Sequence, residues 1–411
     1  MKLKPLTKFS LYGFLKNQRY FEPFIILAFL AKDFSFFQIG ILIGFREICA
    51  NLLEIPTGAI ADALGRKRTM IASHFGYIIA FLLLGYAGTY YLFFPGMFAF
   101  SIGEAFRTGT HKAIIFQWMK KEGIAEQKTK IYGHTRFYSK LGSAVSAWIA
   151  ASFLLCLDNY SWAFYLSAIP IFLNIINFIS YPDYVDGDAK KGASAGEVFR
   201  HLIYGLRVCA FKKKLRQLLI ESTTFEGIYK STKDYLQPVV QAFVVSLPIM
   251  ENFSDKKRVI ILIAIIYSVL HFLSAKASKQ AAWFEAKFKN TDKALNTLWC
   301  FLIIMFAVML CGLKVNPVLS IIAFVVLAVL QNLWRPIMIS QVADQAKQKY
   351  MSTVLSTESQ CKNLFTAILA PVIGYFADNL SNDCKFVPVA ITGLVLGCLV
   401  LLSKILRSGN P

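Results

Sequence analysis

The chain has 411 residues, of which 56% are hydrophobic and only 17% are charged, and its mean hydropathy is +0.51. A water-soluble protein of this length cannot bury so much apolar side chain, so lipid must be the solvent for much of the surface. The formal net charge of +20 would suit nucleic acid if it formed one patch. Lys and Arg occur instead in short clusters between apolar runs, which argues against nucleic-acid binding.

Apolar runs, taken in chain order, predict the membrane spans, because a helix needs about 20 apolar residues to cross the hydrocarbon. Before the polar stretch 181–214 there are six such runs, at 10–31, 38–61, 69–88, 91–118, 134–157 and 160–180. After it there are six more, at 215–246, 259–275, 294–313, 317–345, 352–378 and 386–404. The fourth, seventh and tenth runs are long, and we expect them to be tilted or bent.

This order predicts an all-α membrane protein with twelve transmembrane helices in two six-helix bundles. We place the N-terminal bundle at residues 1–180 and the C-terminal bundle at 215–411. Between them, residues 181–214 form a cytoplasmic linker. Its segment EVFRHLIYGLRV has apolar residues three and four apart, as in a short amphipathic helix lying on the membrane surface.

The distribution of Lys and Arg predicts the orientation. They gather at the N-terminus, in every second loop, in the linker and at the C-terminus, which places both termini in the cytoplasm and the chain in the cell membrane. The cluster Lys256–Arg258 falls on the opposite side, and we interpret it either as an anchor in the outer leaflet or as a sign that this span is bounded wrongly.

Ionisable residues inside the predicted spans are the main clue to function, because a charge there needs a partner or a watery cavity. The cations are Lys16, Arg19, Arg46, Arg107, Lys112, Arg136, Lys140, Lys230, Lys233, Arg335 and Lys362. The acids are Glu22, Glu47, Glu54, Glu104, Glu221, Glu226, Asp234 and Glu358. Spans 3, 6, 9 and 12 carry no such charge in their cores and can face lipid, whereas the other spans share a polar interior.

A loop motif identifies a family. Between the second and third spans, on the basic side, the chain reads GAIADALGRKR, from Gly58 to Arg68. This resembles the pattern G-x-x-x-D-x-x-G-R-K/R of the major facilitator superfamily, with Ala63 in place of a usual Arg and with no such pattern in the matching loop of the second half. The segment PVIGYFAD, Pro371 to Asp378, is similar to the helix-breaking end of span 11 in many members.

The resemblance implies a secondary transporter in which two six-helix halves rock about a cavity bounded chiefly by spans 1, 4, 7 and 10. In that family the loop latches one half against the other. The latch residues here are Gly58, Asp62, Gly65, Arg66, Lys67 and Arg68.

The interior cations outnumber the interior acids, which predicts an organic anion as the transported solute, because Arg can hold a carboxylate or phosphate bidentately. The predicted substrate-binding residues are Arg19, Tyr20, Arg107, Tyr229, Lys230, Lys233, Trp334 and Arg335. For proton coupling the candidates are Glu22, Glu104, Glu226 and Glu358. The alternative for each charge is an ion pair that only positions the bundle, above all for Arg46, Glu47, Glu54, Arg136 and Glu221.

No enzymatic motif competes with this interpretation. The sequence has no GxxxxGK[ST], GxSxG or HExxH, and its eight Cys show no CxxC spacing, so we expect neither catalysis nor a metal or other cofactor. The expected partners are a small-molecule substrate, the lipid bilayer and a coupling ion, with the chain acting as a monomer. Two other functions remain open: proton-coupled multidrug efflux, which the absence of a Gly-Pro motif on span 5 disfavours, and a non-transporting receptor or scaffold, which the interior charges disfavour.

Overall fold

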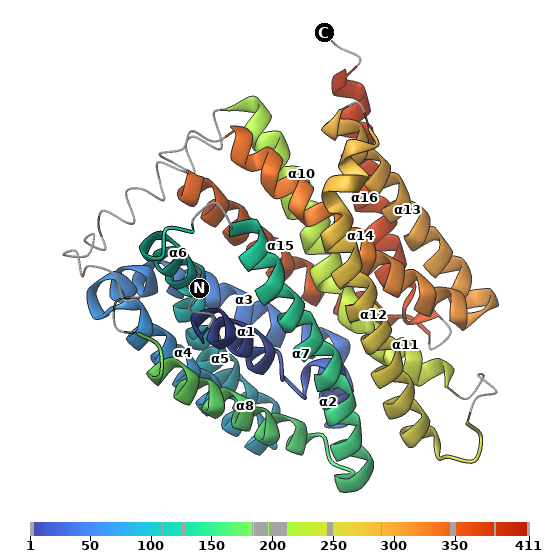
Figure 1. The fold of residues 1–411 in the computed structure, drawn as a ribbon. Coiled ribbons are helices and arrows are strands. Elements are labelled where there is room, and N and C mark those ends of the chain that lie inside the picture. Colours follow the sequence, from blue (N-terminus) through green and yellow to red (C-terminus); the bar gives the residue numbers. More distant parts are fainter. Residues whose placement is uncertain are drawn as a thin grey trace. The chain divides into compact units, whose positions relative to one another are not determined.

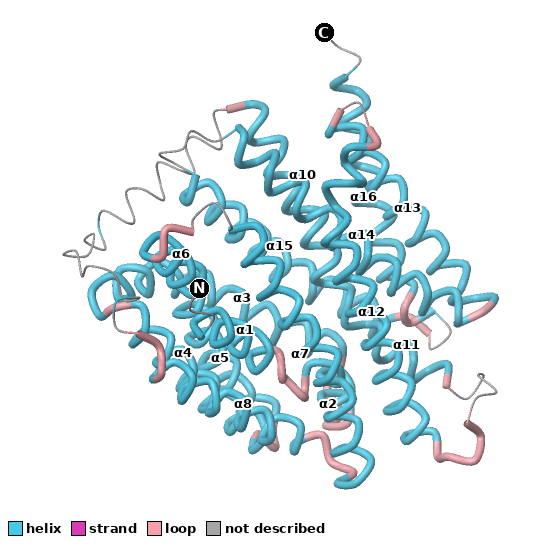
Figure 2. The backbone as a smooth tube through the Cα atoms, in the orientation of Figure 1, coloured by secondary structure: helices cyan, strands magenta, loops and turns pink. Residues whose placement is uncertain are grey.

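The structure is a computed structural model. It describes residues 4–108, 110–124, 128–182, 184, 196, 212–244, 250–288, 290–345, 351–381 and 384–408, and within these ranges it is helical without strands (Figure 2). The chain separates into two compact units (Figure 1). Unit 1 comprises Met1–Ala28 and Phe45–Arg200, and unit 2 comprises Phe29–Gly44 and His201–Pro411. Helix α3 therefore begins in unit 2 and ends in unit 1.

Unit 1 is built from α-helices joined by short turns. Its α-helices are α1 (Lys4–Lys16), most of α3 (Phe36–Leu64), α4 (Arg66–Tyr86), α5 (Phe93–Arg107), α6 (Thr110–Lys121), α7 (Lys128–Leu157) and α8 (Ser161–Ile179), and the turn η1 (Glu22–Phe24) with the start of α2 (Ile25–Leu30) follows α1. Helix α4 packs against α5 and α8, while α1 packs against α7 and α8. Each predicted span of this half coincides with one helix or with two consecutive ones.

Unit 2 repeats this plan. Its helices are α10 (Lys213–Thr232), α11 (Leu236–Phe243), α12 (Asp255–Ala286), α13 (Thr291–Val315), α14 (Pro317–Gln345), α15 (Met351–Asn379) and α16 (Val387–Ser408), with the turn η5 (Lys233–Tyr235) between α10 and α11. Helix α13 packs against α14 and α16, and α10 packs against α15 and α16. The third span thus contacts the fourth and sixth in one unit exactly as the ninth contacts the tenth and twelfth in the other, which is the pattern of an internal repeat.

Three predicted spans are interrupted, and the interruptions follow from the sequence. Spans 1 and 7 both pass through a 3-10 turn, η1 or η5, and resume as a short helix. Pro23 lies in η1 and Pro238 in the first turn of α11, and a proline lacks the N–H that a continuous helix would need at those positions. Span 4 is divided into α5 and α6. The expected bends of spans 4 and 7 are therefore confirmed, whereas span 10 is the single helix α14 and span 1 carries a break that was not predicted.

Apolar side chains cover the outside of several helices. On α8 the residues Ile169, Phe172, Ile176 and Ile179 are each about half exposed and share one face, since they are three or four apart. Helices α4, α13 and α16 carry similar exposed stripes. These are spans 3, 6, 9 and 12, and such surfaces suit contact with lipid.

Eight helices are long and apolar enough to cross a membrane among the residues described: α3, α4, α7, α8, α12, α13, α14 and α16. The other four predicted spans are the three interrupted ones and the eleventh, α15, whose first half MSTVLSTESQCKN is polar. An all-α membrane fold is confirmed by these helices, and the count of twelve spans stays a prediction.

Candidate functional site

The first candidate site lies inside unit 1, and we name it the Arg19 cluster: Lys16, Arg19, Tyr77, Glu104 and Arg107. Nη2 of Arg19 donates to Oε1 of Glu104 at 2.9 Å. Nη2 of Arg107 donates to the other oxygen, Oε2, of the same carboxylate. Nε of Arg107 also donates to the hydroxyl of Tyr77 at 3.0 Å. One carboxylate therefore bridges two guanidinium groups that the sequence places in different spans.

Helix ends position these charges. Helix α1 ends at Lys16, and the side chain of Gln18 then donates to the carbonyl of Gly142 on α7 at 2.9 Å, which fixes the connecting turn. Helix α5 ends at Arg107, where Thr108 donates from both its backbone N–H and its hydroxyl to the carbonyl of Glu104. Broken helices near the middle of the bilayer are where transporters of this architecture hold their substrates.

Aromatic rings form one wall of the cluster. The guanidinium carbon of Arg19 lies 5.0 Å from the ring centroid of Tyr77 and 5.1 Å from that of Phe100. Arg46 lies 5.5 Å from the same Phe100 ring and pairs with Glu47 at 2.8 Å. Cations over ring faces at this distance are attracted to the ring quadrupole. Arg19 is therefore held on one side by a carboxylate and on another by π-systems.

Positive charge in the cluster exceeds what its hydrogen bonds neutralise. Nε of Arg19 is buried and has no hydrogen-bond partner within the described residues. Lys16 lies close enough to Arg19, Arg107 and Glu104 to interact electrostatically with all three, yet it forms no ion pair in the part of the chain that the structure describes. Sequence reasoning counted Lys16 among the interior cations but left it out of the substrate set. Its signal was its position three residues before Arg19 within the same predicted span.

The side chains of Tyr12 and His111 lie next to the cluster. The ring centroids of Tyr12 and His111 are 3.8 Å apart, and Nε2 of His111 lies 3.4 Å from the hydroxyl of Tyr181. These contacts tie α6 to α1 and to Tyr181, which follows α8, so His111 packs between these elements. Neither Tyr12 nor Tyr77 was on the predicted list.

The second candidate site lies inside unit 2, and we name it the Arg335 cluster: Ser222, Glu226, Gln331, Arg335 and Glu358. Arg335 binds Glu358 bidentately, with Nη1 to Oε1 at 2.5 Å and Nη2 to Oε2 at 2.9 Å. The Ser222 hydroxyl donates to Oε1 of Glu358 at 2.6 Å. Glu226 accepts a hydrogen bond from Nε2 of Gln331 at 2.8 Å, and Nε of Arg335 is 3.9 Å away. The guanidinium group of Arg335 therefore contacts two carboxylates, those of Glu226 and Glu358.

The other predicted substrate residues of unit 2 lie apart from that ion pair. Nζ of Lys230 donates to Oδ1 of Asn363 at 3.0 Å, and Lys233, within η5, pairs with Asp234 at 2.7 Å. Trp334 is fully buried, and its ring stacks on Phe225 with centroids 4.2 Å apart and an interplanar angle of 2°. The Trp334 ring is therefore part of the packed core of unit 2.

The remaining predicted side chains are more peripheral. Tyr229 is partly buried on α10. The backbone N–H of Tyr20 donates to the hydroxyl of Ser167 at 2.8 Å, and its ring meets Phe153 edge-on. Glu22 is exposed within η1. The structure therefore brings Arg19, Glu104 and Arg107 together in one place and Glu226, Arg335 and Glu358 in another.

One flanking acid is engaged in a structural contact. Oε1 of Glu221 accepts from Nζ of Lys404 at 2.6 Å and from Nε1 of Trp299 at 2.9 Å. Lys404 was expected at the C-terminal boundary of the last span, but α16 continues to Ser408 and holds it within the helix. Similarly, α12 begins at Asp255, so Arg258 lies in its first turn, buried and paired with Asp255 at 2.9 Å, and not in a loop.

The predicted latch loop is a tight connection between α3 and α4. Gly65 separates the two helices and has φ of +90°, a backbone conformation that favours glycine. Nζ of Lys67 donates to the carbonyl of Tyr181 at 2.9 Å, which ties the loop to the end of α8 within unit 1. The surroundings of Gly58 and the side chain of Asp62 lie outside the described part of the chain. Arg66 and Arg68 flank Lys67 at the start of α4.

Helix α15 runs through Pro371 and ends at Asn379, directly after the segment Pro371 to Asp378 that resembles the end of span 11. The end of this helix has another role. Both carboxylate oxygens of Asp378 accept from the start of α3, Oδ1 from the N–H of Phe36 at 2.9 Å and Oδ2 from that of Phe37 at 2.7 Å. An acid at this position satisfies two of the unpaired N–H groups at a helix N-terminus. Asp378 thus fastens the first turn of α3 to α15 within unit 2.

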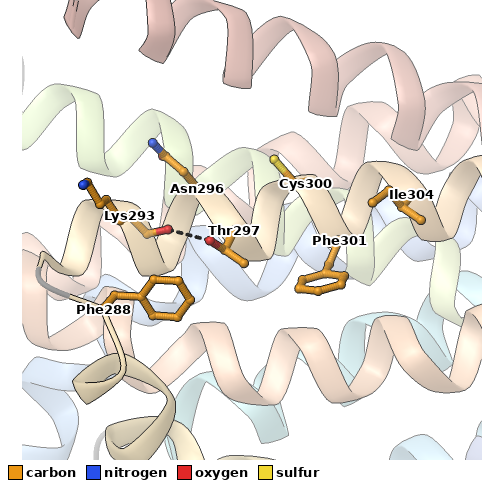
Figure 3. Close-up of a pocket in the computed structure, with 7 residues that line it drawn as sticks. All are labelled: Phe288, Lys293, Asn296, Thr297, Cys300, Phe301 and Ile304. Carbon is orange, nitrogen blue, oxygen red and sulfur yellow. Dashed lines mark hydrogen bonds between the residues drawn. The ribbon is translucent and has the colours of Figure 1, made fainter.

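A shallow groove of about 450 Å³ lies elsewhere in unit 2, along one face of α13 (Figure 3). Its lining residues are Phe288, Lys293, Asn296, Thr297, Cys300, Phe301 and Ile304. The Thr297 hydroxyl is bonded to the Lys293 carbonyl of its own helix. None of the predicted binding residues lines this groove, so it is distinct from both clusters.

Similarity to known proteins agrees with the fold. Residues 17–359 match the family model described as Major Facilitator Superfamily. The chain is 21% identical over 381 residues to the uncharacterized MFS-type transporter YxaM of Bacillus subtilis (strain 168), covering 91% of this chain and 89% of that protein.

Solved structures share the fold at low sequence identity. The nucleoside transporter NupG superposes with a TM-score of 0.75 at 14% identity, covering 100% of both chains. A peptide transporter POT in complex with sulfate superposes with a TM-score of 0.73 at 13% identity, covering 98% of this chain and 94% of that one.

These findings show an integral, multi-pass membrane protein whose relatives are transporters and not enzymes. The family model spans most of the sequence and includes the motif between α3 and α4. The chain therefore belongs to the major facilitator superfamily of secondary transporters.

Proposed function

We propose that this transporter moves a small organic anion, carrying a carboxylate or a phosphate, across the cell membrane by alternating access driven by a proton gradient. Both termini lie in the cytoplasm in this proposal, and the monomer is the working unit. The anion binds at the Arg19 cluster of unit 1, with Arg19, Arg107 and Lys16 as its cationic ligands.

The observation that carries the proposal is the uneven charge of the Arg19 cluster. Three cations, Lys16, Arg19 and Arg107, surround a single carboxylate, that of Glu104. Glu22 is near enough to interact with Lys16 and Arg19, but it is exposed. An unneutralised charge within a membrane protein is expensive and marks a substrate or ion pathway. A bound anion would supply the missing negative charge and accept a hydrogen bond from the unpartnered Nε of Arg19.

Aromatic neighbours extend the proposed site. Tyr12, Tyr77 and Phe100 lie against the same cations, and flat apolar faces beside a charged group suit a ligand with a ring or an unsaturated portion. Among the solved proteins with this fold, NupG is a nucleoside transporter, and the peptide transporter POT was solved in complex with sulfate. The fold therefore accommodates polar and anionic molecules.

Binding and transport of carboxylates test this proposal directly. Purified protein in liposomes should exchange an unlabelled for a radiolabelled carboxylate from a panel such as pyruvate, succinate, citrate and benzoate. Arg107→Gln should weaken binding of the anion that the wild type accepts and leave any neutral ligand unaffected. Lys120→Gln is the matched control, because Lys120 is an exposed cation of the same unit on α6. If lipophilic cations bind tightly and no anion competes with them, multidrug efflux replaces the anion proposal.

We also propose that the loop around Gly65 acts as a conformational latch. Asp62→Asn should then reduce transport strongly and change equilibrium binding of the solute much less. Complete loss of binding in a folded Asp62→Asn variant would contradict this role and place Asp62 in the substrate site.

A further inference from the structure

The four acids that are candidates for proton coupling differ sharply in their partners. Glu104 is held between two guanidinium groups, those of Arg19 and Arg107. Glu358 is held by both Nη atoms of Arg335 and by the Ser222 hydroxyl. A carboxylate with charge-assisted bonds to both oxygens loses those bonds when it takes up a proton, so such pairs resist protonation.

Glu22 is unsuited for a different reason. It lies in η1 and is exposed. A group that must carry a proton between two aqueous compartments has to be enclosed, since an exposed carboxylate exchanges protons with one solution continuously. Exposure therefore sets Glu22 apart from Glu226 and Glu358, which are buried, and from Glu104, whose side chain is 23% exposed.

Glu226 combines burial with weak pairing. Its side chain is only 9% exposed, and its one hydrogen bond within the described residues comes from the neutral amide of Gln331, at 2.8 Å. The nearest cation, Nε of Arg335, is 3.9 Å away, and both Nη atoms of that arginine are already bound to Glu358. Neutralising Glu226 would break no ion pair at hydrogen-bond distance.

Helix α10 carries Glu226, and α14, α15, α16 and η5 pack against it. The charged residues of these elements are Lys213, Lys214, Arg216, Glu221 and Lys230 on α10, Lys233 and Asp234 in η5, Arg335 and Asp344 on α14, Glu358, Lys362 and Asp378 on α15, and Lys404 and Arg407 on α16. Of these, Lys213, Lys214, Arg216, Asp344 and Asp378 are exposed. Lys404 is engaged by Glu221, Lys233 by Asp234 and Lys230 by Asn363. Lys362 acts electrostatically on Glu358. Among the described buried acids of unit 2, Glu226 is thus the one whose cation contact, with Nε of Arg335 at 3.9 Å, is longer than a hydrogen bond.

We propose that Glu226 is the group that carries the coupling proton, while Glu104 and Glu358 are permanent partners of arginine. This inference rests on the proposed function for its role in transport. A proton taken from water on one side converts the Glu226 carboxylate to a neutral carboxyl group, and its release on the other side restores the carboxylate. The bidentate pair of Arg335 and Glu358 stays closed throughout, so Arg335 remains fixed while its neighbour changes charge.

Infrared difference spectroscopy tests the proton site without any substrate. Wild-type protein in phosphatidylcholine liposomes, taken from alkaline to acidic buffer, should gain the C=O stretch of a protonated carboxyl group that is shielded from solvent. Glu226→Gln should abolish this band. Glu104→Gln and Glu358→Gln should keep it. Glu221→Gln is the matched control, since Glu221 is a buried acid on the same helix with a cation partner.

Transport measurements provide the second readout. Glu226→Gln should retain counterflow of the carboxylate that the wild type transports and lose its accumulation in response to a pH gradient. Persistence of the band in Glu226→Gln, absence of any such band in the wild type, or proton-driven accumulation by Glu226→Gln would each overturn the inference. If the wild type transports no anion of the panel but the band belongs to Glu226, the anion proposal fails and the proton site stands.

Discussion

The Arg19 cluster of unit 1 and the Arg335 cluster of unit 2 are built from the same residue types in opposite proportions. In the first, three cations surround one carboxylate, and in the second, one guanidinium lies beside two carboxylates. The two clusters lie partly on equivalent spans of the repeated plan, since Lys16 and Glu226 belong to spans 1 and 7, and Arg107 and Arg335 belong to spans 4 and 10. A repeat that keeps its packing can therefore diverge in charge, and in the proposed function one half binds the anion and the other the proton.

The largest expected effect is a difference in stability between variants of the two clusters. Glu104→Leu leaves two buried guanidinium groups without their carboxylate and should lower the free energy of unfolding by about 3–5 kcal/mol. Glu358→Leu should cost less, because Arg335 can turn to Glu226, which is 3.9 Å away. Thermal unfolding in detergent measures both. An equal or reversed order would show that the clusters do not differ in how their charges are balanced.

The next effect concerns affinity. Lys16→Gln should weaken binding of the transported anion about tenfold or more, since a hydrogen bond to a charged group contributes about 1.5–3 kcal/mol. The unfolding temperature of Lys16→Gln should equal or exceed that of the wild type, because Lys16 has no ion pair to lose in the described part of the chain. Isothermal titration and thermal unfolding of the same samples measure the two quantities. A fall in unfolding temperature as large as that of Arg107→Gln would make Lys16 a structural residue.

A smaller effect concerns the pair formed by Glu221 and Lys404. A double-mutant cycle with Glu221→Gln and Lys404→Gln should give a coupling energy of about 1 kcal/mol, because the two side chains are in contact and mostly buried. Anion binding and proton-driven transport should be unchanged in all three variants. A change in proton dependence would mean that Glu221 belongs to the Arg335 cluster.

The smallest effect belongs to the loop between α3 and α4. Lys67→Ala removes one hydrogen bond to the carbonyl of Tyr181 and should lower the free energy of unfolding by about 0.5–1.5 kcal/mol. Chemical denaturation in detergent measures the change. A loss several times larger would indicate that Lys67 has partners beyond α8 and that the loop stabilises more than its own unit.

The helices were predictable because they depend on local pattern. Apolar runs of the right length recur along the chain, and the structure places a helix or a pair of helices on each of them. The break in span 1 was missed because Lys16 to Phe21 was absorbed into one long apolar run. Only Pro23, one turn later, signalled it. Span 10 was expected to bend for its length, yet α14 is continuous through Pro336.

The candidate site was predictable as a set of residues but not as a geometry. Arg19 and Glu104 were both listed, yet they are 85 residues apart and no sequence pattern links them. For the same reason the choice among the buried acids was open, because whether an acid is clamped depends on arginines from other spans. Trp334 was expected to flank a ligand because it is next to Arg335 in the sequence. Its ring instead packs in the core against Phe225.

That stacked pair has an optical consequence. Trp334 and Phe225 are the sequence neighbours of Arg335 and Glu226, so the stacked indole ring lies on the same two helices as the proposed proton site. Indole emission responds to local electric fields, and the parallel stack on Phe225 holds the ring in one orientation. Uptake of a proton by Glu226 should therefore shift the emission of Trp334, and Trp334→Phe should remove that shift. With such a shift, the state of unit 2 could be followed without an attached dye.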